Sequence, residues 1–459
     1  MTTHIIYPDG LPPPRRYWSM ATTMMVIAIC VLDTTMISVA LPSIALAFDE
    51  SAASSIWIIN GYQLAILVGL MPLASLGENI GYRRVSQTGL VIFTIASLGC
   101  AFANTLLELT IARVIQGLGA AAIISVNAAL VRFTYPARTL GRATGMNAMV
   151  AAVATAAGPS FGAAVLAVAD WRWLFAVNVP IGIVAAAIAQ FSLPHTERSE
   201  RSLSCMSVAL HVGTFGFLIA GLQSLVHEET RLVAALQIAA AAVFGMLLVR
   251  REIDKHVPIV PFDLMRIPIY SISLGISMCS FFAQMAAFVS LPFEMQRLGR
   301  SAVEIGLLMT PWPLAVAIAA PIAGRLADRH SAAILSGFGL AALAAGLASL
   351  ALFPENGTAF DFMWRMGLCG VGFGFFQAPN NRTIMSLPPR ARSGAAAGMM
   401  STVRSLGHAS GAALVAVLFS THDEDGAQIA LMTAAVMAVV AAVLSFSRLR
   451  AANTKKPTR

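Results

Sequence analysis

The fold of this chain is constrained above all by its long apolar runs, which follow one another with only short polar segments between them. A helix needs about 20 apolar residues to cross the hydrocarbon of a bilayer, and most runs approach that length. Backbone groups cannot stay unpaired in hydrocarbon, so each run is expected to be helical. With 57% hydrophobic and 11% charged residues, the chain also has too little charge to cover a soluble protein of 459 residues.

The runs predict fourteen membrane-spanning helices. They are expected near residues 18–41, 55–76, 85–103, 106–131, 143–169, 174–193, 206–226, 232–249, 269–293, 305–323, 332–353, 360–379, 395–420 and 427–446. The first run is too long for the apolar core of a cleaved signal peptide and contains Asp33, so we interpret it as the first span.

The basic residues predict the orientation of the chain. If the N-terminus lies inside, 23 of the 30 Lys and Arg residues fall in cytoplasmic segments, four in outer segments and three within helices. This bias follows the positive-inside rule, and it accounts for the net charge of +8 without a nucleic-acid partner. We therefore expect both termini in the cytoplasm.

The sequence gives little support to catalytic chemistry. The five cysteines lie within apolar runs and lack the spacing of metal ligands, so neither disulfides nor a metal site is expected. We find no phosphate-binding glycine loop after a strand and no nucleophile triad. An enzyme, ATP-driven transport and a bound cofactor are therefore disfavoured.

An internal repeat divides the chain. Glu78 and Asp328 occupy similar segments 328 − 78 = 250 residues apart, and the intrahelical Arg113 and Arg365 are 365 − 113 = 252 residues apart. Such a spacing indicates a duplicated six-helix unit, which is an architecture of many secondary transporters.

The repeat predicts four parts of the chain. We expect an N-terminal six-helix half at 1–193, an inserted helix pair with its linkers at 194–262, a C-terminal six-helix half at 263–447 and a basic cytoplasmic tail at 448–459.

An ordered set of motifs resembles the major facilitator superfamily, and specifically its fourteen-helix drug:proton antiporter branch. The motifs are Leu32-Asp33-Thr34-Thr35-Met36-Ile37-Ser38-Val39-Ala40-Leu41-Pro42, Trp57 with Tyr62 and Leu64, Leu76-Gly77-Glu78-Asn79-Ile80-Gly81-Tyr82-Arg83-Arg84, Arg113-Val114-Ile115-Gln116-Gly117-Leu118-Gly119-Ala120-Ala121, Gly158-Pro159-Ser160-Phe161-Gly162, Trp171-Arg172-Trp173-Leu174-Phe175 and Asn178-Val179-Pro180-Ile181-Gly182. The cytoplasmic motif departs from the family pattern, with Glu78 in place of the usual Asp, Asn79 in place of a common Arg and Ala74 in place of Gly.

The resemblance implies an all-α polytopic membrane protein with two six-helix halves and an inserted helix pair. It further implies a monomer in a bacterial inner membrane that exports amphipathic, cationic drugs or biocides in exchange for protons. Small-molecule substrates, protons and lipid would be its partners, without nucleic acid.

Asp33 is the strongest candidate for proton coupling. A carboxylate in a membrane span costs about 2.5–3.5 kcal/mol on insertion scales, so Asp33 is expected to have a functional or structural role that offsets this cost. A buried carboxyl group can exchange a proton near neutral pH, and a cationic substrate could compete for its charge. The alternative is a structural ion pair with an arginine on a neighbouring helix.

Arg113 carries a similar cost, and the matching arginine of the family is linked to proton transfer. It could instead pair with Asp33 or bond backbone carbonyls. Gln116 lies three residues further on, on a similar face. Arg365 and Arg404 are the buried basic residues of the second half, and we interpret them as packing or gating residues.

The helix with Gly158, Pro159 and Gly162 is expected to bend and pack closely, because proline removes a hydrogen bond and glycine permits close approach. The family resemblance makes this the antiporter motif. An ordinary kink is the alternative.

Charged residues near the expected cytoplasmic mouth could bridge the two halves and act as a gate. They are Glu78, Arg83, Arg84, Asp328 and Arg329. Their alternative role is to set topology alone.

Polar and aromatic residues within the spans are candidates for substrate binding. They are Trp57, Asn60, Tyr62, Gln63, Gln116, Asn147, Gln284, Glu294, Trp312 and Gln377. Aromatic faces attract organic cations. Glu294 could attract cations or face bulk water, and His408 could titrate or simply pack.

Two other functions remain open. The same fold could carry a single metabolite or an organic anion bound by Arg113, and a non-transporting receptor or membrane-embedded enzyme is a third class. Transport of a fluorescent cation as opposed to an anion would separate the first two.

Overall fold

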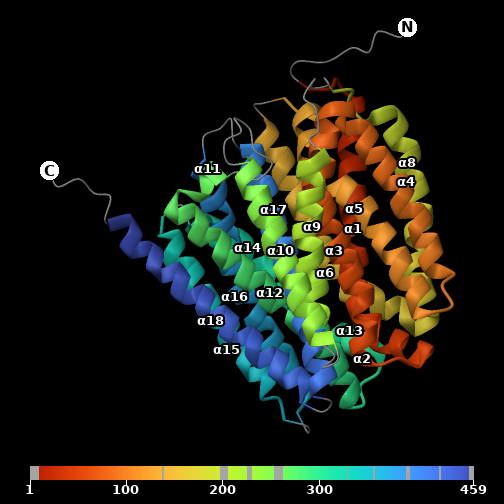
Figure 1. The fold of residues 1–459 in the computed structure, drawn as a ribbon, viewed down its shortest axis with the longest axis vertical. Coiled ribbons are helices and arrows are strands. Elements are labelled where there is room, and N and C mark those ends of the chain that lie inside the picture. Colours follow the sequence, from red (N-terminus) through yellow and green to blue (C-terminus); the bar gives the residue numbers. More distant parts are fainter. Residues whose placement is uncertain are drawn as a thin grey trace.

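The computed structural model describes residues 10–136, 139–196, 205–224, 230–252, 262–327, 329–354, 357–388, 393–422 and 425–453. The elements in these ranges are helices, and most run side by side (Figure 1). Their bounds are α1 Arg15–Phe48, α2 Ala52–Ser55, α3 Trp57–Ile80, α4 Tyr82–Ala101, α5 Leu106–Thr134, α6 Leu140–Val168, α7 Arg172–Ala176, α8 Asn178–Ser192, α9 Cys205–Ser224, α10 Arg231–Glu252, α11 Phe262–Met265, α12 Pro268–Arg297, α13 Ala302–Met309, α14 Pro311–Leu326, α15 Ala332–Ala351, α16 Ala359–Ser386, α17 Ser393–Thr421 and α18 Gly426–Asn453.

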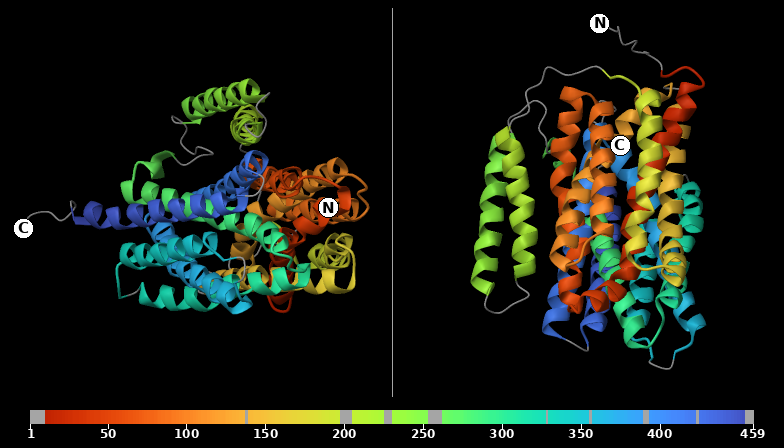
Figure 2. Two further views of the ribbon diagram at one scale, coloured as in Figure 1. Left: turned by 90° about the horizontal axis from the view of Figure 1, so that it is seen from below. Right: turned by 90° about the vertical axis from the view of Figure 1, so that its right-hand side faces the viewer.

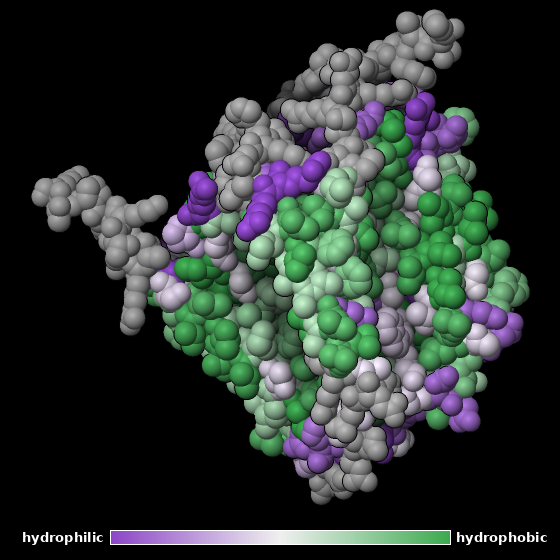
Figure 3. Space-filling model, viewed as in Figure 1, coloured by the Kyte–Doolittle hydropathy of each residue, from purple (hydrophilic) through white to green (hydrophobic). Residues whose placement is uncertain are grey.

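The helices have the length and composition of membrane spans. In the described residues, eleven are long and apolar enough to cross a bilayer, or twelve if the bent α6 is one span. The apolar part of α9, Met206–Leu222, is shorter, and α16, which carries Asp361, Arg365 and Arg382, is not among them. The expected number of fourteen therefore stays a prediction. On the face shown in Figure 3, hydrophobic residues fill the middle and hydrophilic residues lie toward the two ends.

Local sequence signals explain where several helices begin. Ser301 and Thr358 each form a capping box, which satisfies free backbone N–H groups at the starts of α13 and α16. Pro311 stands at the start of α14, where its missing N–H costs little. One expectation differs: α18 continues to Asn453, so the expected tail at 448–459 begins inside a helix.

The helices pack in two groups with matching contacts. In the first group, α5 packs against α3 and α4, and α1 packs against α6 and α8. In the second group, α16 packs against α14 and α15, and α12 packs against α17 and α18. The α9–α10 pair stands at one side of the molecule (Figure 2), where α9 contacts α3 and α17.

Close helix contacts recur at the spacing of the sequence repeat. A Cβ on Gly117 of α5 would lie 2.6 Å from the Tyr62 carbonyl oxygen of α3, and a Cβ on Gly370 of α16 would lie 2.2 Å from the Trp312 carbonyl oxygen of α14. These glycines are 370 − 117 = 253 residues apart, and their partners are 312 − 62 = 250 residues apart. The duplicated pattern thus has a matching pair of helix crossings.

The two groups share a hydrophobic core at one end of the bundle. We call the end where α1 begins proximal and the end where it terminates distal. The largest cluster joins α1 near Met36–Leu41 to α12 near Met285–Leu291, toward the distal end. Clusters nearer the proximal end draw on one group each, such as Val85 with Leu130 in the first and Leu274 with Ile384 in the second.

We predict that Gly370→Ala destabilises the protein by about 1–3 kcal/mol, because the added methyl group would collide with the α14 backbone. Gly367→Ala is the matched control, since a Cβ at Gly367 of the same helix would meet nothing within 4 Å. Thermal unfolding of the purified variants measures the difference. Equal unfolding temperatures would contradict this account of the crossing.

Candidate functional site

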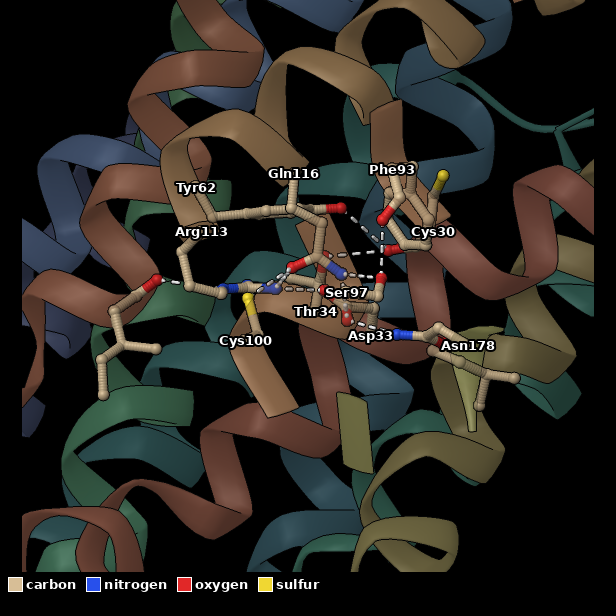
Figure 4. A network of polar contacts seen from close by, with 12 residues as sticks. Cys30, Asp33, Thr34, Tyr62, Phe93, Ser97, Cys100, Arg113, Gln116 and Asn178 are labelled. Carbon is tan, nitrogen blue, oxygen red and sulfur yellow. Dashed lines mark hydrogen bonds and ion pairs between the residues drawn. The ribbon is translucent and has the colours of Figure 1, made fainter. Parts of the chain in front are cut away.

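Asp33 lies within α1 and is the centre of a buried polar network (Figure 4). Its Oδ2 accepts a hydrogen bond from the Arg113 guanidinium, with which it forms an ion pair. Its Oδ1 accepts hydrogen bonds from Gln116 Nε2 at 3.0 Å and from Asn178 Nδ2 at 2.8 Å. With three donors directed at it, the carboxyl group acts only as an acceptor, which is the role of its ionised form.

Arg113 is held by more than its ion pair. Its Nε donates to the Ile58 carbonyl oxygen of α3 at 3.2 Å, and its Nη1 donates to Gln116 Oε1 at 2.6 Å. The guanidinium lies 4.0 Å from the ring centroid of Tyr62, within the range of a cation–π interaction. Both alternatives from the sequence therefore occur together, since Arg113 pairs with Asp33 and also bonds a backbone carbonyl.

Two residues complete the network that sequence reasoning did not assign to it. Ser97 of α4 accepts a hydrogen bond from Gln116 Nε2 at 2.8 Å, and Asn178 begins α8. Asn178 follows the Trp171-Arg172-Trp173 motif, so a polar residue at a helix start was the available signal. The network joins α1, α3, α4, α5 and α8 of the first group.

The network is sealed in this conformation. Asp33 is 0% exposed and Arg113 is 1% exposed. A buried charge with one partner removed costs several kcal/mol, so the two residues are energetically interdependent. Protonating Asp33 would remove its negative charge and place a donor hydrogen on one of its oxygens, which would weaken its pairing with Arg113.

The glycines of α6 press against α1 about one turn beyond Asp33. A Cβ on Gly158 would lie 1.8 Å from Thr35 Oγ1, and a Cβ on Gly162 would lie 3.1 Å from the Met36 carbonyl oxygen. Pro159 stands inside α6, and its carbonyl oxygen would lie 2.7 Å from a Cβ on Gly306 of α13. The motif therefore places the carboxylate-bearing helix next to the second group.

The expected gating residues do not bridge the groups within the described part of the chain. Arg83 donates to the carbonyl oxygen of Leu193 at 3.3 Å and lies 2.6 Å from His195 Nε2, both at the end of its own group. Glu78, Arg84 and Arg329 are exposed. Asp328 lies outside the described residues. A gating role stays a prediction for another conformation.

The substrate-binding candidates do not share one environment. Tyr62 and Gln116 belong to the Asp33 network, and Asn60, Gln63 and Trp312 are buried elsewhere. Glu294 pairs with Arg297 at 2.8 Å, and Trp57 is 39% exposed. The remaining candidates, which are only partly exposed, are Asn147, Gln284 and Gln377. Both amide atoms of Asn60 and the indole nitrogen of Trp312 are buried without a hydrogen-bond partner in the structure.

The second group holds basic residues in contrasting settings. Arg365 lies over the rings of Phe353 and Trp364, while Arg404 lies 5.9 Å from the Phe281 ring centroid. Arg448, which the sequence placed in a cytoplasmic tail, is 3% exposed. It donates to Ser273 Oγ at 3.0 Å and to Asn380 Oδ1 at 2.9 Å. A helix longer than expected therefore brings a tail residue into the packed interior.

Comparison with known proteins decides the family. The Major Facilitator Superfamily model matches residues 23–412 and 273–459. The chain belongs to the major facilitator superfamily. It is a multi-pass membrane transporter of that superfamily and not an enzyme. The structure is similar to that of a bacterial homologue of the human lysosomal transporter Spinster, with a TM-score of 0.69, 15% identity, and coverage of 98% of this chain and 100% of that chain.

Three curated relatives show the range of functions around this chain. It is 47% identical to the uncharacterized transporter YebQ of Escherichia coli (strain K12), over 96% of this chain and 97% of the relative. It is 28% identical to the riboflavin transporter RibZ of Clostridioides difficile (strain 630), over 86% and 88%. It is 30% identical to the multidrug resistance protein Stp of Mycobacterium tuberculosis, over 84% and 72%.

We predict that Asp33→Asn and Arg113→Gln each destabilise the protein by about 3–5 kcal/mol, because each leaves a buried group without its partner. The double variant should lose less than the sum of the two, as expected for residues in contact. Thermal unfolding of all four proteins measures this coupling.

The control for this cycle is the exposed pair of Asp170 and Arg172, whose atoms lie 3.0 Å apart. Asp170→Asn should cost no more than about 1 kcal/mol. Additive effects in the Asp33 and Arg113 cycle would show that the pair does not stabilise the fold.

Proposed function

We propose that this transporter is a proton-coupled exporter of amphipathic small molecules that works by alternating access, in the manner of the drug:proton antiporter branch. The observation that carries the proposal is the buried pair of Asp33 and Arg113, which is the arrangement a proton switch requires. An ionisable group within a span is costly and is by default a functional hypothesis.

The proposed switch follows from the hydrogen bonds. A proton that enters from outside would bind Asp33, remove its negative charge and weaken its hold on Arg113, Gln116 and Asn178. Loss of that proton to the cytoplasm would restore the ion pair. Because α6 packs against α1 at Thr35, a change around Asp33 can reach the contact between the groups.

The same proposal assigns the two ends of the bundle. We take the proximal end as cytoplasmic, in agreement with the distribution of Lys and Arg, and place both termini there in a bacterial inner membrane. The hydrophobic cluster that joins the groups toward the distal end then corresponds to an outer side that is closed. We propose a monomer as the transporting unit.

Different observations favour two substrate classes. The similarity to Stp favours export of drugs, and the sequence favours cations. In this conformation, however, the Asp33 carboxylate is fully engaged by protein donors. The second candidate is a narrow transporter of a metabolite or organic anion. The similarity to RibZ favours it, as does Arg404, whose guanidinium has no ion pair among the described residues.

We predict that Asp33→Asn abolishes export driven by a pH gradient while leaving substrate exchange without a gradient within about threefold of wild type. The amide cannot carry a proton at any working pH, so only the coupled mode should fail. Transport of the cation ethidium and of the anion 2-naphthoate in proteoliposomes, each measured with an imposed gradient and then in counterflow, separates these modes.

Glu294→Gln is the matched control for this test, since Glu294 already pairs with Arg297 near the end of α12. It should retain both modes. Gradient-driven export that persists in Asp33→Asn at the wild-type rate would refute the coupling role.

We also predict that a disulfide between Ser160→Cys and Thr310→Cys locks the transporter. The two hydroxyl oxygens lie 2.6 Å apart, between α6 and the start of α14, so cysteines there should be close enough to bond. In a background without the five native cysteines, oxidation should reduce transport to near background and reductant should restore it. Full transport by the oxidised, cross-linked protein would mean that this contact does not open.

A further inference from the structure

Like Arg365 of α16, Arg404 of α17 has no ion pair or hydrogen bond among the described residues, unlike Arg113 and Arg448. Within the described residues its guanidinium forms no ion pair and donates no hydrogen bond. It lies over the face of the Phe281 ring, 5.9 Å from the ring centroid. An arginine inside a membrane span needs a counter-charge or several acceptors. Arg113 has Asp33, and Arg448 has Ser273 and Asn380, but Arg404 has neither kind of partner.

Polar and aromatic side chains lie together near Arg404. His408 lies four residues later, on the same face of α17. Its Nε2 is 3.4 Å from Gln284 Oε1 of α12, which leaves the Gln284 amide nitrogen without a partner among the described residues. The His408 ring also meets Phe281 edge to face, with centroids 5.3 Å apart.

The polar residues of this site are less buried than the aromatic ring that they adjoin. Arg404, His408 and Gln284 are each partly exposed, whereas Phe281 behind them is 4% exposed. Phe281 in turn packs against Phe373 and Phe376 of α16, which makes a rigid apolar wall. By contrast, Nε and Nη1 of Arg365 are inaccessible, so Arg365 is less suited to receive a ligand.

We propose that Arg404, His408 and Gln284 bind the acidic group of an aromatic organic anion or zwitterion, with the Phe281 wall against its ring. A guanidinium fork matches the two oxygens of a carboxylate, and the Gln284 amide supplies a further donor. The proposal rests on the transport function and names its substrate class. Recognition then occurs in the second group, and proton exchange occurs at Asp33 in the first.

Binding to the purified full-length protein tests this assignment. The probes are 2-naphthoate and 2-naphthamide, which share a ring and differ in the acidic group. Thermal unfolding is measured at equal concentrations of each, because a ligand that binds the native state raises the unfolding temperature. The wild type should bind the carboxylate about 10-fold or more tightly than the amide.

Variants locate the site. Arg404→Gln should abolish the preference for the carboxylate, while Arg404→Lys should keep much of it because the charge remains. Arg365→Gln removes the same charge from another place in the second group and should keep the full preference. If Arg404→Gln does not fold, the location of the site is still tested by comparing the carboxylate preference of the wild type with that of Arg404→Lys and Arg365→Gln.

Three results would overturn the proposal: equal binding of the two probes by wild type, a preference that persists in Arg404→Gln, or a preference lost in Arg365→Gln. This binding assay uses no proton gradient. A carboxylate preference together with intact coupling in Asp33→Asn would therefore refute the proton switch and leave the anion site standing.

Discussion

The structure of the first helix group depends on one interaction, the ion pair of Asp33 and Arg113 in a region that excludes water. Neither charge is tolerable there alone, and together they recruit Gln116, Asn178 and the Ile58 carbonyl oxygen. The pair thereby ties together five helices that meet around α1. Because protonation would remove the negative charge that pairs with Arg113, an interaction that stabilises the fold can also serve as a switch.

The two groups share their architecture and differ in their charges. The helix crossings at Gly117 and Gly370 repeat with nearly the same geometry. Arg113 has a carboxylate, whereas its repeat counterpart Arg365 lies over aromatic rings and Arg404 lies over the Phe281 ring. We infer that the duplicated scaffold divides the work, with proton exchange in one group and recognition of the substrate's acidic group in the other.

The sequence predicted the helical fold and the two residues of the buried ion pair. Apolar runs predicted an all-helical membrane protein, and the cost of a buried charge identified Asp33 and Arg113 before their contact was known. Asn178 belongs to one of the motifs that resemble the family, but it was not assigned to the Asp33 network because a polar residue at a helix start has many possible roles. Arg448 was misplaced because hydropathy alone ended the last span too early, whereas α18 continues to Asn453. Partners across helices depend on packing angles, which a linear pattern does not contain.

The central claim is that Asp33 itself takes up the coupled proton. Infrared difference spectroscopy of the purified protein, recorded as the pH is lowered, reports the C=O stretch of a newly protonated carboxyl group in an apolar environment. The account predicts such a band in the wild type, over the pH range in which transport is coupled, and its loss in Asp33→Asn. A band of equal intensity in Asp33→Asn, or no band in the wild type while coupling operates, would contradict it.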